Sequence, residues 1–79
     1  MYNISVVLID KHEDIIDDFF LDSCPTLDGA EAEATKYIKG KKDPRIDDMI
    51  NVSGPGDMIE VWIQHDDDPS AYYLAGRIK

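Results

Sequence analysis

The chain has 79 residues, a formal net charge of −9 and one cysteine, Cys24. A lone cysteine excludes an intramolecular disulfide, and this length predicts a single domain, residues 1–79, whose thin core must rest on hydrophobic packing or on self-association. No apolar run approaches the roughly 20 residues of a membrane span, and the first residues lack the layout of a secretory signal, so we expect a cytoplasmic protein.

The negative charge is concentrated in the first part of the chain. Nine of the 17 carboxylates lie within the first 35 residues, where Lys11 is the only base, so this stretch carries −8 of the net −9. Such a surplus repels nucleic acids and membrane surfaces and attracts positively charged protein surfaces. We therefore expect no direct binding to nucleic acid or membrane, and a partner that is a basic protein or ribonucleoprotein complex.

The chain begins with two predicted strands. Residues 2–9 are rich in β-branched side chains and predict a strand, and residues 10–14 form a polar turn. In residues 15–23 one set of side chains, Asp18, Phe20 and Asp22, alternates with another, Asp17, Phe19 and Leu21. This arrangement favours a second strand and a hairpin. The apolar positions of this segment also fit a helix, and its short periodicity leaves that alternative open.

The next segment has the features of a helix from Leu27 to Lys39. Thr26 stands at the position of an N-cap, and Gly40 ends the pattern. Acidic residues in the first turn and lysines in the last match the helix dipole. One stripe of this helix is apolar and would pack on a sheet; it consists of Leu27, Ala30, Ala34 and Ile38.

The remaining residues predict a short helical turn and two more strands. Asp43 can cap a turn that starts at Pro44 and points Ile46, Met49 and Ile50 inward. Residues 58–65 alternate between apolar and polar side chains, and residues 71–78 form a last strand after a turn at 66–70. The predicted fold is α+β, a two-layer ββαββ arrangement with one helix packed on a four-stranded antiparallel sheet.

A single layer of helix covers one face of such a sheet and leaves the other open. The predicted core consists of Ile4, Val6, Leu8, Phe19, Leu21, Ile59, Val61, Ile63, Tyr72, Leu74 and Ile78. The predicted open face consists of Val7, Ile9, Phe20, Trp62, Tyr73 and Arg77, rimmed by Asp18, Asp22 and Glu60. Aromatic side chains beside a polar rim are typical of a protein-binding patch. The alternative is that a second copy of the chain, or the connection around residues 46–50, covers this face.

No residue pattern indicates catalysis, a metal site or a cofactor site, so we expect a protein that is not an enzyme and holds no cofactor. The run from His65 to Asp68 lacks the spacing of a calcium loop and is typical of a solvated turn. Cys24 has no histidine placed by sequence to activate it, and is interpreted as a small core residue.

In size, acidity and element order the whole chain resembles small phage-encoded anti-CRISPR proteins, with residues 19–32 at the strand-to-helix junction. The resemblance implies an inhibitor without enzymatic activity, which binds a type I CRISPR surveillance complex in an infected bacterial host and blocks its binding to target DNA. Carboxylates would then pair with the lysines and arginines that normally hold DNA phosphates. The implied contact residues are Asp14, Asp17, Asp18, Asp22, Glu31 and Glu33, with Phe20, Trp62 and Tyr73 as anchors and Glu60 at the rim.

A second interpretation is an antitoxin-like or regulatory module that neutralises a basic protein and dimerises through the open face. It assigns Trp62 to a homodimer core, whereas the first interpretation makes Trp62 an anchor for the partner. Both a monomer and a homodimer are therefore compatible with the sequence.

Overall fold

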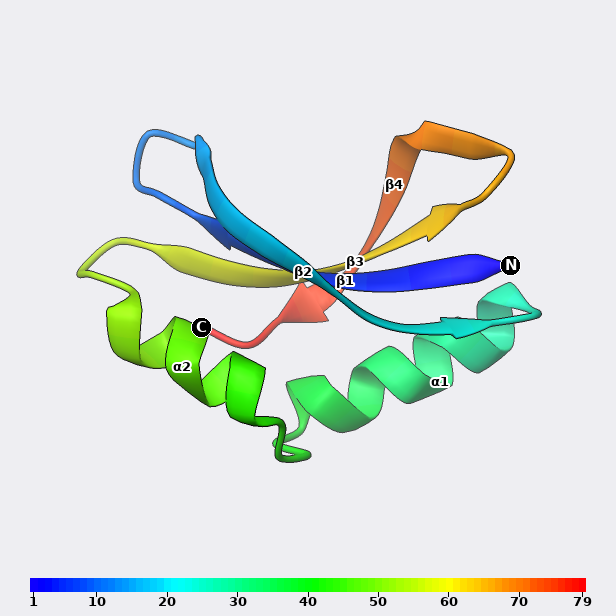
Figure 1. Cartoon of the computed structure of the whole chain (residues 1–79), viewed down its shortest axis with the longest axis horizontal. Helices are drawn as coiled ribbons and strands as arrows, with labels where there is room; N and C mark the ends of the chain where they lie inside the picture. Colours follow the sequence, from blue (N-terminus) through cyan, green and yellow to red (C-terminus); the bar gives the residue numbers. More distant parts are fainter.

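The computed structural model describes all 79 residues and contains four strands and two helices. In chain order these are β1 (Tyr2–Ile9), β2 (Ile15–Cys24), α1 (Leu27–Ile38), α2 (Pro44–Val52), β3 (Met58–His65) and β4 (Asp68–Arg77). The fold is α+β, with both helices beneath one face of a four-stranded antiparallel sheet (Figure 1). Neither helix is long and apolar enough to cross a membrane.

The prediction of a single helix in a ββαββ order is wrong, because the turn expected at Pro44 is a complete helix. The side chain of Asp43 caps α2 by accepting a hydrogen bond from the backbone N–H of Arg45, and Pro44 occupies the first turn. Ile46 and Met49 are buried against the part of the sheet that α1 does not cover. The order is therefore ββααββ, and each helix covers a different part of the same sheet face.

The sheet has the strand order β2-β1-β3-β4, so β1 and β3 are central and β2 and β4 are edges. The segment from Ile15 to Cys24 is a strand, which confirms the first of the two alternatives for it. Its alternating aspartates lie on an unpaired edge, where charged side chains oppose the pairing of further strands. A strand buried on both faces could not accommodate these residues.

The core lies between the sheet and the two helices in two adjoining clusters. Under α1 the buried side chains are Ile4, Ala30, Ala34, Val61 and Ile63, and under α2 they are Val6, Leu8, Ile46, Met49 and Ile59. The two alanines let α1 approach the sheet closely. Phe19, Leu21 and Ile78 pack partly buried against these clusters, as their predicted core positions require.

A β-bulge corrects the predicted faces of β4. Val61 pairs with Gly76 but Trp62 pairs with Leu74, so Ala75 is an extra residue that reverses the alternation along the strand. Tyr73 pairs with the buried Ile63 and thus lies on the helix side, not on the open face. Tyr72 and Leu74 lie on the open face instead, where they are 53% and 44% exposed. The prediction that these two residues belong to the core is wrong.

A second bulge changes the position of Asp22 on β2. Phe20 pairs with Ser5 and Asp22 pairs with Ile4, so Leu21 is the extra residue there. Because Ile4 faces the helices, Asp22 also lies on the helix side and not on the rim of the open face. Asp18 and Phe20 keep their predicted side.

The N-cap of α1 offers a direct test of the local structure. The hydroxyl oxygen of Thr26 accepts a hydrogen bond of 3.0 Å from the backbone N–H of Gly29. Thr26→Ala is expected to lower the free energy of unfolding by about 1 kcal/mol, measured by urea denaturation. Thr35→Ala is the control, because the Thr35 hydroxyl donates back to a helical carbonyl, that of Glu31, and does not cap the helix. Equal losses for the two variants would contradict this role of Thr26.

Candidate protein-binding site

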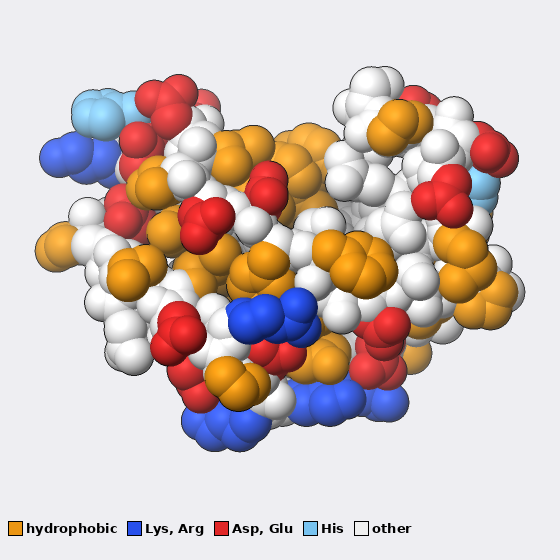
Figure 2. Space-filling model, viewed as in Figure 1, with side chains coloured by type: hydrophobic (Ala, Val, Ile, Leu, Met, Phe, Trp, Pro, Cys, Tyr) orange, Lys and Arg blue, Asp and Glu red, His pale blue; other side chains and the backbone are white.

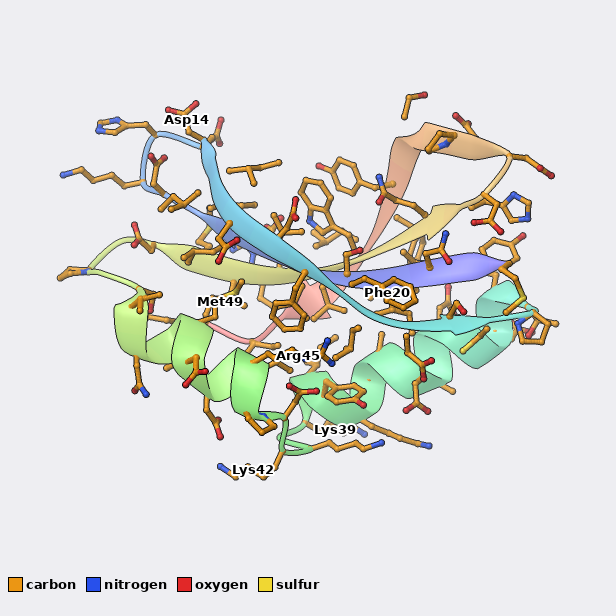
Figure 3. The ribbon with its side chains drawn as sticks, viewed as in Figure 1. Asp14, Phe20, Lys39, Lys42, Arg45 and Met49 are labelled. Carbon is orange, nitrogen blue, oxygen red and sulfur yellow. The ribbon has the colours of Figure 1, made fainter.

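The turn between β1 and β2 is stabilised by the carboxylate of Asp10. One oxygen of Asp10 accepts hydrogen bonds from the backbone N–H groups of His12 (2.8 Å) and Asp14 (2.9 Å). Glu13 adopts a positive φ of 67°, which completes the tight turn. The Asp10 carboxylate is therefore used within the turn, while Glu13 and Asp14 are exposed, with Asp14 at the raised end of the hairpin (Figure 3).

Three further aspartates are exposed along the β2 edge. Asp18 pairs with Val7 on the open side, whereas Asp17 and Asp22 lie on the helix side. We call the exposed carboxylates of Glu13, Asp14, Asp17, Asp18 and Asp22 the acidic hairpin. None of them takes part in an ion pair. They are thus free to pair with an external cation, and they line an edge of the sheet instead of a single face.

The other two predicted acidic contacts lie elsewhere. The Glu33 carboxylate is bound by Lys36 (3.1 Å) and Lys41 (3.3 Å), and hydrogen bonds from these ammonium groups lower its pKa. Glu31 lies beside Tyr73, and its negative charge raises the pKa of the Tyr73 hydroxyl. Because Tyr73 belongs to β4, the structure places it and Glu31 at the sheet edge opposite the acidic hairpin.

The open face carries a hollow between its two raised hairpins (Figure 2). Its volume is about 340 Å³, and it is lined by Ile9, Glu13, Ile15, Met58, Glu60, Trp62, Tyr72 and Arg77. The rings of Trp62 and Tyr72 are stacked, with centroids 3.9 Å apart and planes 9° from parallel. We call this feature the open-face hollow.

Glu60 is the only buried charged side chain, with 7% of its surface exposed. Its carboxylate accepts hydrogen bonds from Trp62 Nε1 (3.0 Å) and from Arg77 Nε (3.2 Å). A carboxylate this buried requires such partners. Glu60 therefore fixes the indole of Trp62 and neutralises Arg77, and it is a wall of the hollow rather than part of an exposed rim as predicted.

Several residues of the hollow were not among the predicted contact residues. Alternation along β3 places Met58, Glu60 and Trp62 on one face, which the structure confirms. Ile15 is the first residue of β2, and its pairing with Ile9 follows a bulge that the sequence does not mark. The sequence predicts Tyr72 in the core, because nothing in it marks the bulge at Ala75.

Most of the basic side chains lie at the opposite end of the molecule, whereas Lys11 belongs to the turn between β1 and β2 and Arg77 lines the hollow. Lys39 and Lys42 lie around the connection between α1 and α2, below the sheet (Figure 3), and neither is in an ion pair. Figure 2 shows lysine and arginine side chains mixed with carboxylates at this end, and carboxylates on both raised hairpins, with a basic side chain beside them on the left hairpin. The hairpins are therefore the more acidic end of the molecule.

Comparisons with protein-family models, with curated proteins and with solved structures found no match. No group of three or more histidine, cysteine, aspartate or glutamate side chains is arranged to hold a metal ion. Cys24 is a free thiol that packs partly buried against the cluster under α1.

Proposed function

We propose that this protein is an acidic inhibitor that acts without enzymatic chemistry, by binding a basic nucleic-acid-binding surface of another protein and excluding nucleic acid from it. The observation that carries the proposal is the acidic hairpin, five exposed carboxylates with no internal cation to neutralise them. Surfaces that bind phosphates present arginine and lysine side chains, which also form short, charge-assisted hydrogen bonds with carboxylates.

The uneven distribution of charge supports this function in a second way. A basic partner is attracted more strongly to the hairpin end than to the end that carries Lys39 and Lys42, so encounters would favour the orientation that brings the acidic hairpin into contact. Charge complementarity of this kind raises association rates and disfavours the wrong orientation.

The size of the protein is sufficient for such an interface. A standard interface buries roughly 800 Å² on each partner. The accessible surface of this protein is 4826 Å², so such an interface would use roughly a sixth of it. The β2 edge together with the hairpin ends can supply this area without rearrangement of the core.

The resemblance in size and charge to anti-CRISPR proteins makes a type I CRISPR surveillance complex the first partner to test, in the cytoplasm of an infected bacterium. Purified complex is incubated with increasing amounts of the protein before labelled target DNA is added, and bound DNA is measured by gel shift. We expect DNA binding to be lost near an equimolar ratio, and adding salt to weaken the inhibition. Unchanged DNA binding at low ionic strength and excess protein would contradict this choice of partner.

The wider proposal has its own test, which needs no knowledge of the host. A panel of purified nucleic-acid-binding proteins with basic grooves is titrated with the protein at low ionic strength, where charge attraction is strongest. Displacement of DNA or RNA from one of them supports the proposal. Failure to bind any of them contradicts it.

A further inference from the structure

We infer that the open-face hollow binds one apolar side chain of the partner protein, and that the partner carries lysine or arginine residues on both sides of that anchor. The inference rests on the proposed function. It adds an apolar contact to the charged contacts of the acidic hairpin, so that basic partners with a suitably placed apolar side chain bind more tightly than those without one.

The hollow has the size and the walls for an apolar anchor. Its volume of about 340 Å³ is at the lower end of the range for ligand pockets, enough for one large side chain. Ile9, Ile15, Met58 and the stacked rings of Trp62 and Tyr72 supply apolar surface. Aromatic side chains in a pocket of this kind are typical of the contacts that dominate binding energy.

The hollow is also preformed. The indole of Trp62 is held on one side by its hydrogen bond to Glu60 and on another by the ring of Tyr72. A side chain fixed in this way loses little conformational freedom when a partner binds, which favours affinity.

The charges around the hollow define where the partner's bases would lie. Glu13 lines the hollow and Asp14 stands beside it on the first hairpin, while the second hairpin carries Asp67, 91% exposed, and Asp68 at its turn. Figure 2 shows carboxylates on both raised hairpins, with hydrophobic side chains between them. Inside the hollow the Glu60 carboxylate already accepts hydrogen bonds from Trp62 and Arg77, which leaves Glu13 as the one lining charge without an ion pair. An apolar anchor therefore fits the hollow, and basic residues fit its two sides.

The same charges disfavour a second copy of the chain as the occupant. In a symmetric pair the open faces would meet, and the acidic ends of both hairpins would approach like charges on the other copy. A basic segment with one apolar residue meets complementary charge on both sides.

The single tryptophan of the chain provides the measurement, because its fluorescence and its indole N–H resonance report directly on the hollow. The probes are three short synthetic peptides without tryptophan. The first has a central phenylalanine flanked by lysines, the second has serine in place of the phenylalanine, and the third has glutamates in place of the lysines. We expect the first peptide to shift the indole resonance and to bind about 10- to 100-fold more tightly than the second, from burial of one aromatic side chain. The third should not bind.

Two pairs of variants separate the hollow from its surroundings. Ile15 and Ile16 are 52% and 54% exposed, but only Ile15 lines the hollow. Ile15→Thr should weaken binding of the phenylalanine peptide, and Ile16→Thr should not. In the same way Tyr72→Ala should weaken it, whereas Tyr73→Ala, on the helix side, should leave it unchanged. Circular dichroism verifies that each variant is folded.

The outcomes distinguish this inference from the proposed function. If the serine peptide binds as tightly as the phenylalanine peptide and the indole resonance does not move, the hollow is not a binding site, while the acidic hairpin keeps its proposed role. If neither lysine peptide binds at low ionic strength, the result contradicts both the proposed function and this inference. If sedimentation shows a stable homodimer that Tyr72→Ala dissociates, a second copy occupies the hollow and the inference is wrong.

Discussion

Replacing Asp17, Asp18 and Asp22 together with lysine is expected to weaken binding to a basic partner by at least about 100-fold. Each loss of a close charge pair at an interface costs about 1.5 kcal/mol or more of binding free energy, and the new lysines would also repel the partner's basic residues. Three such changes therefore raise the dissociation constant by more than about 100-fold, even if their effects are not fully additive. The expected change is mainly in the association rate at low ionic strength, with a smaller difference at high salt. Surface plasmon resonance at several salt concentrations measures both.

The control for this variant changes the same net charge at other places. Each replacement of aspartate by lysine adds two units, so three of them change the net charge from −9 to −3 wherever they are made. Asp28, Asp47 and Asp48 are exposed and lie outside both the acidic hairpin and the surroundings of the open-face hollow. If their triple lysine variant loses affinity to the same degree, net charge alone is responsible and the acidic hairpin has no special role.

The sequence is sufficient to predict the two central strands, because the alternation of apolar side chains along β1 and β3 is set by their pairing with each other. Ile4, Val6 and Leu8 pair with Ile63, Val61 and Ile59 in an unbroken register, and these six residues form most of the sheet's inner face. The same regularity does not hold at the edges. Bulges at Leu21 and Ala75 reverse the alternation, and neither residue carries a signal that a bulge will form there. The last strand is longer than predicted, since β4 begins at Asp68, within the expected turn at 66–70.

The candidate site was predicted in part, for the same reason. The exposure of the β2 aspartates is predictable, because three aspartates within residues 15–23 cannot all be buried. The predicted contact set, however, combined residues that lie on opposite edges of the sheet, such as Asp22 on β2 and Tyr73 on β4. Glu60 was predicted as a rim residue, since no sequence pattern indicates that Trp62 and Arg77 would bury and satisfy its carboxylate.

The second helix is underestimated from the sequence because it is only nine residues long, too short for its apolar periodicity to define a helix. Only Ile46 and Met49 are buried in α2, and the segment also contains several charges. Its stability depends on the uncovered half of the sheet, which local propensity does not describe. The contribution of α2 to the free energy of unfolding therefore has to be measured.

Ile59→Ala is expected to lower the free energy of unfolding by about 2–5 kcal/mol, the range for truncating a buried isoleucine. Ile59 is fully buried in the cluster under α2, and a domain of this size has a total stability of only about 4–12 kcal/mol. Ile46→Ala, from α2, should cost a similar amount, and the double variant should lose less than the sum because the two side chains share one cavity. Urea denaturation of all three proteins measures this coupling, with Val52→Ala, whose side chain is 73% exposed, as a control expected to change stability by less than about 0.5 kcal/mol. If Ile46→Ala changes the free energy of unfolding negligibly and the effects of the two substitutions simply add, α2 does not stabilise the sheet. The description of a core formed by both helices would then be wrong.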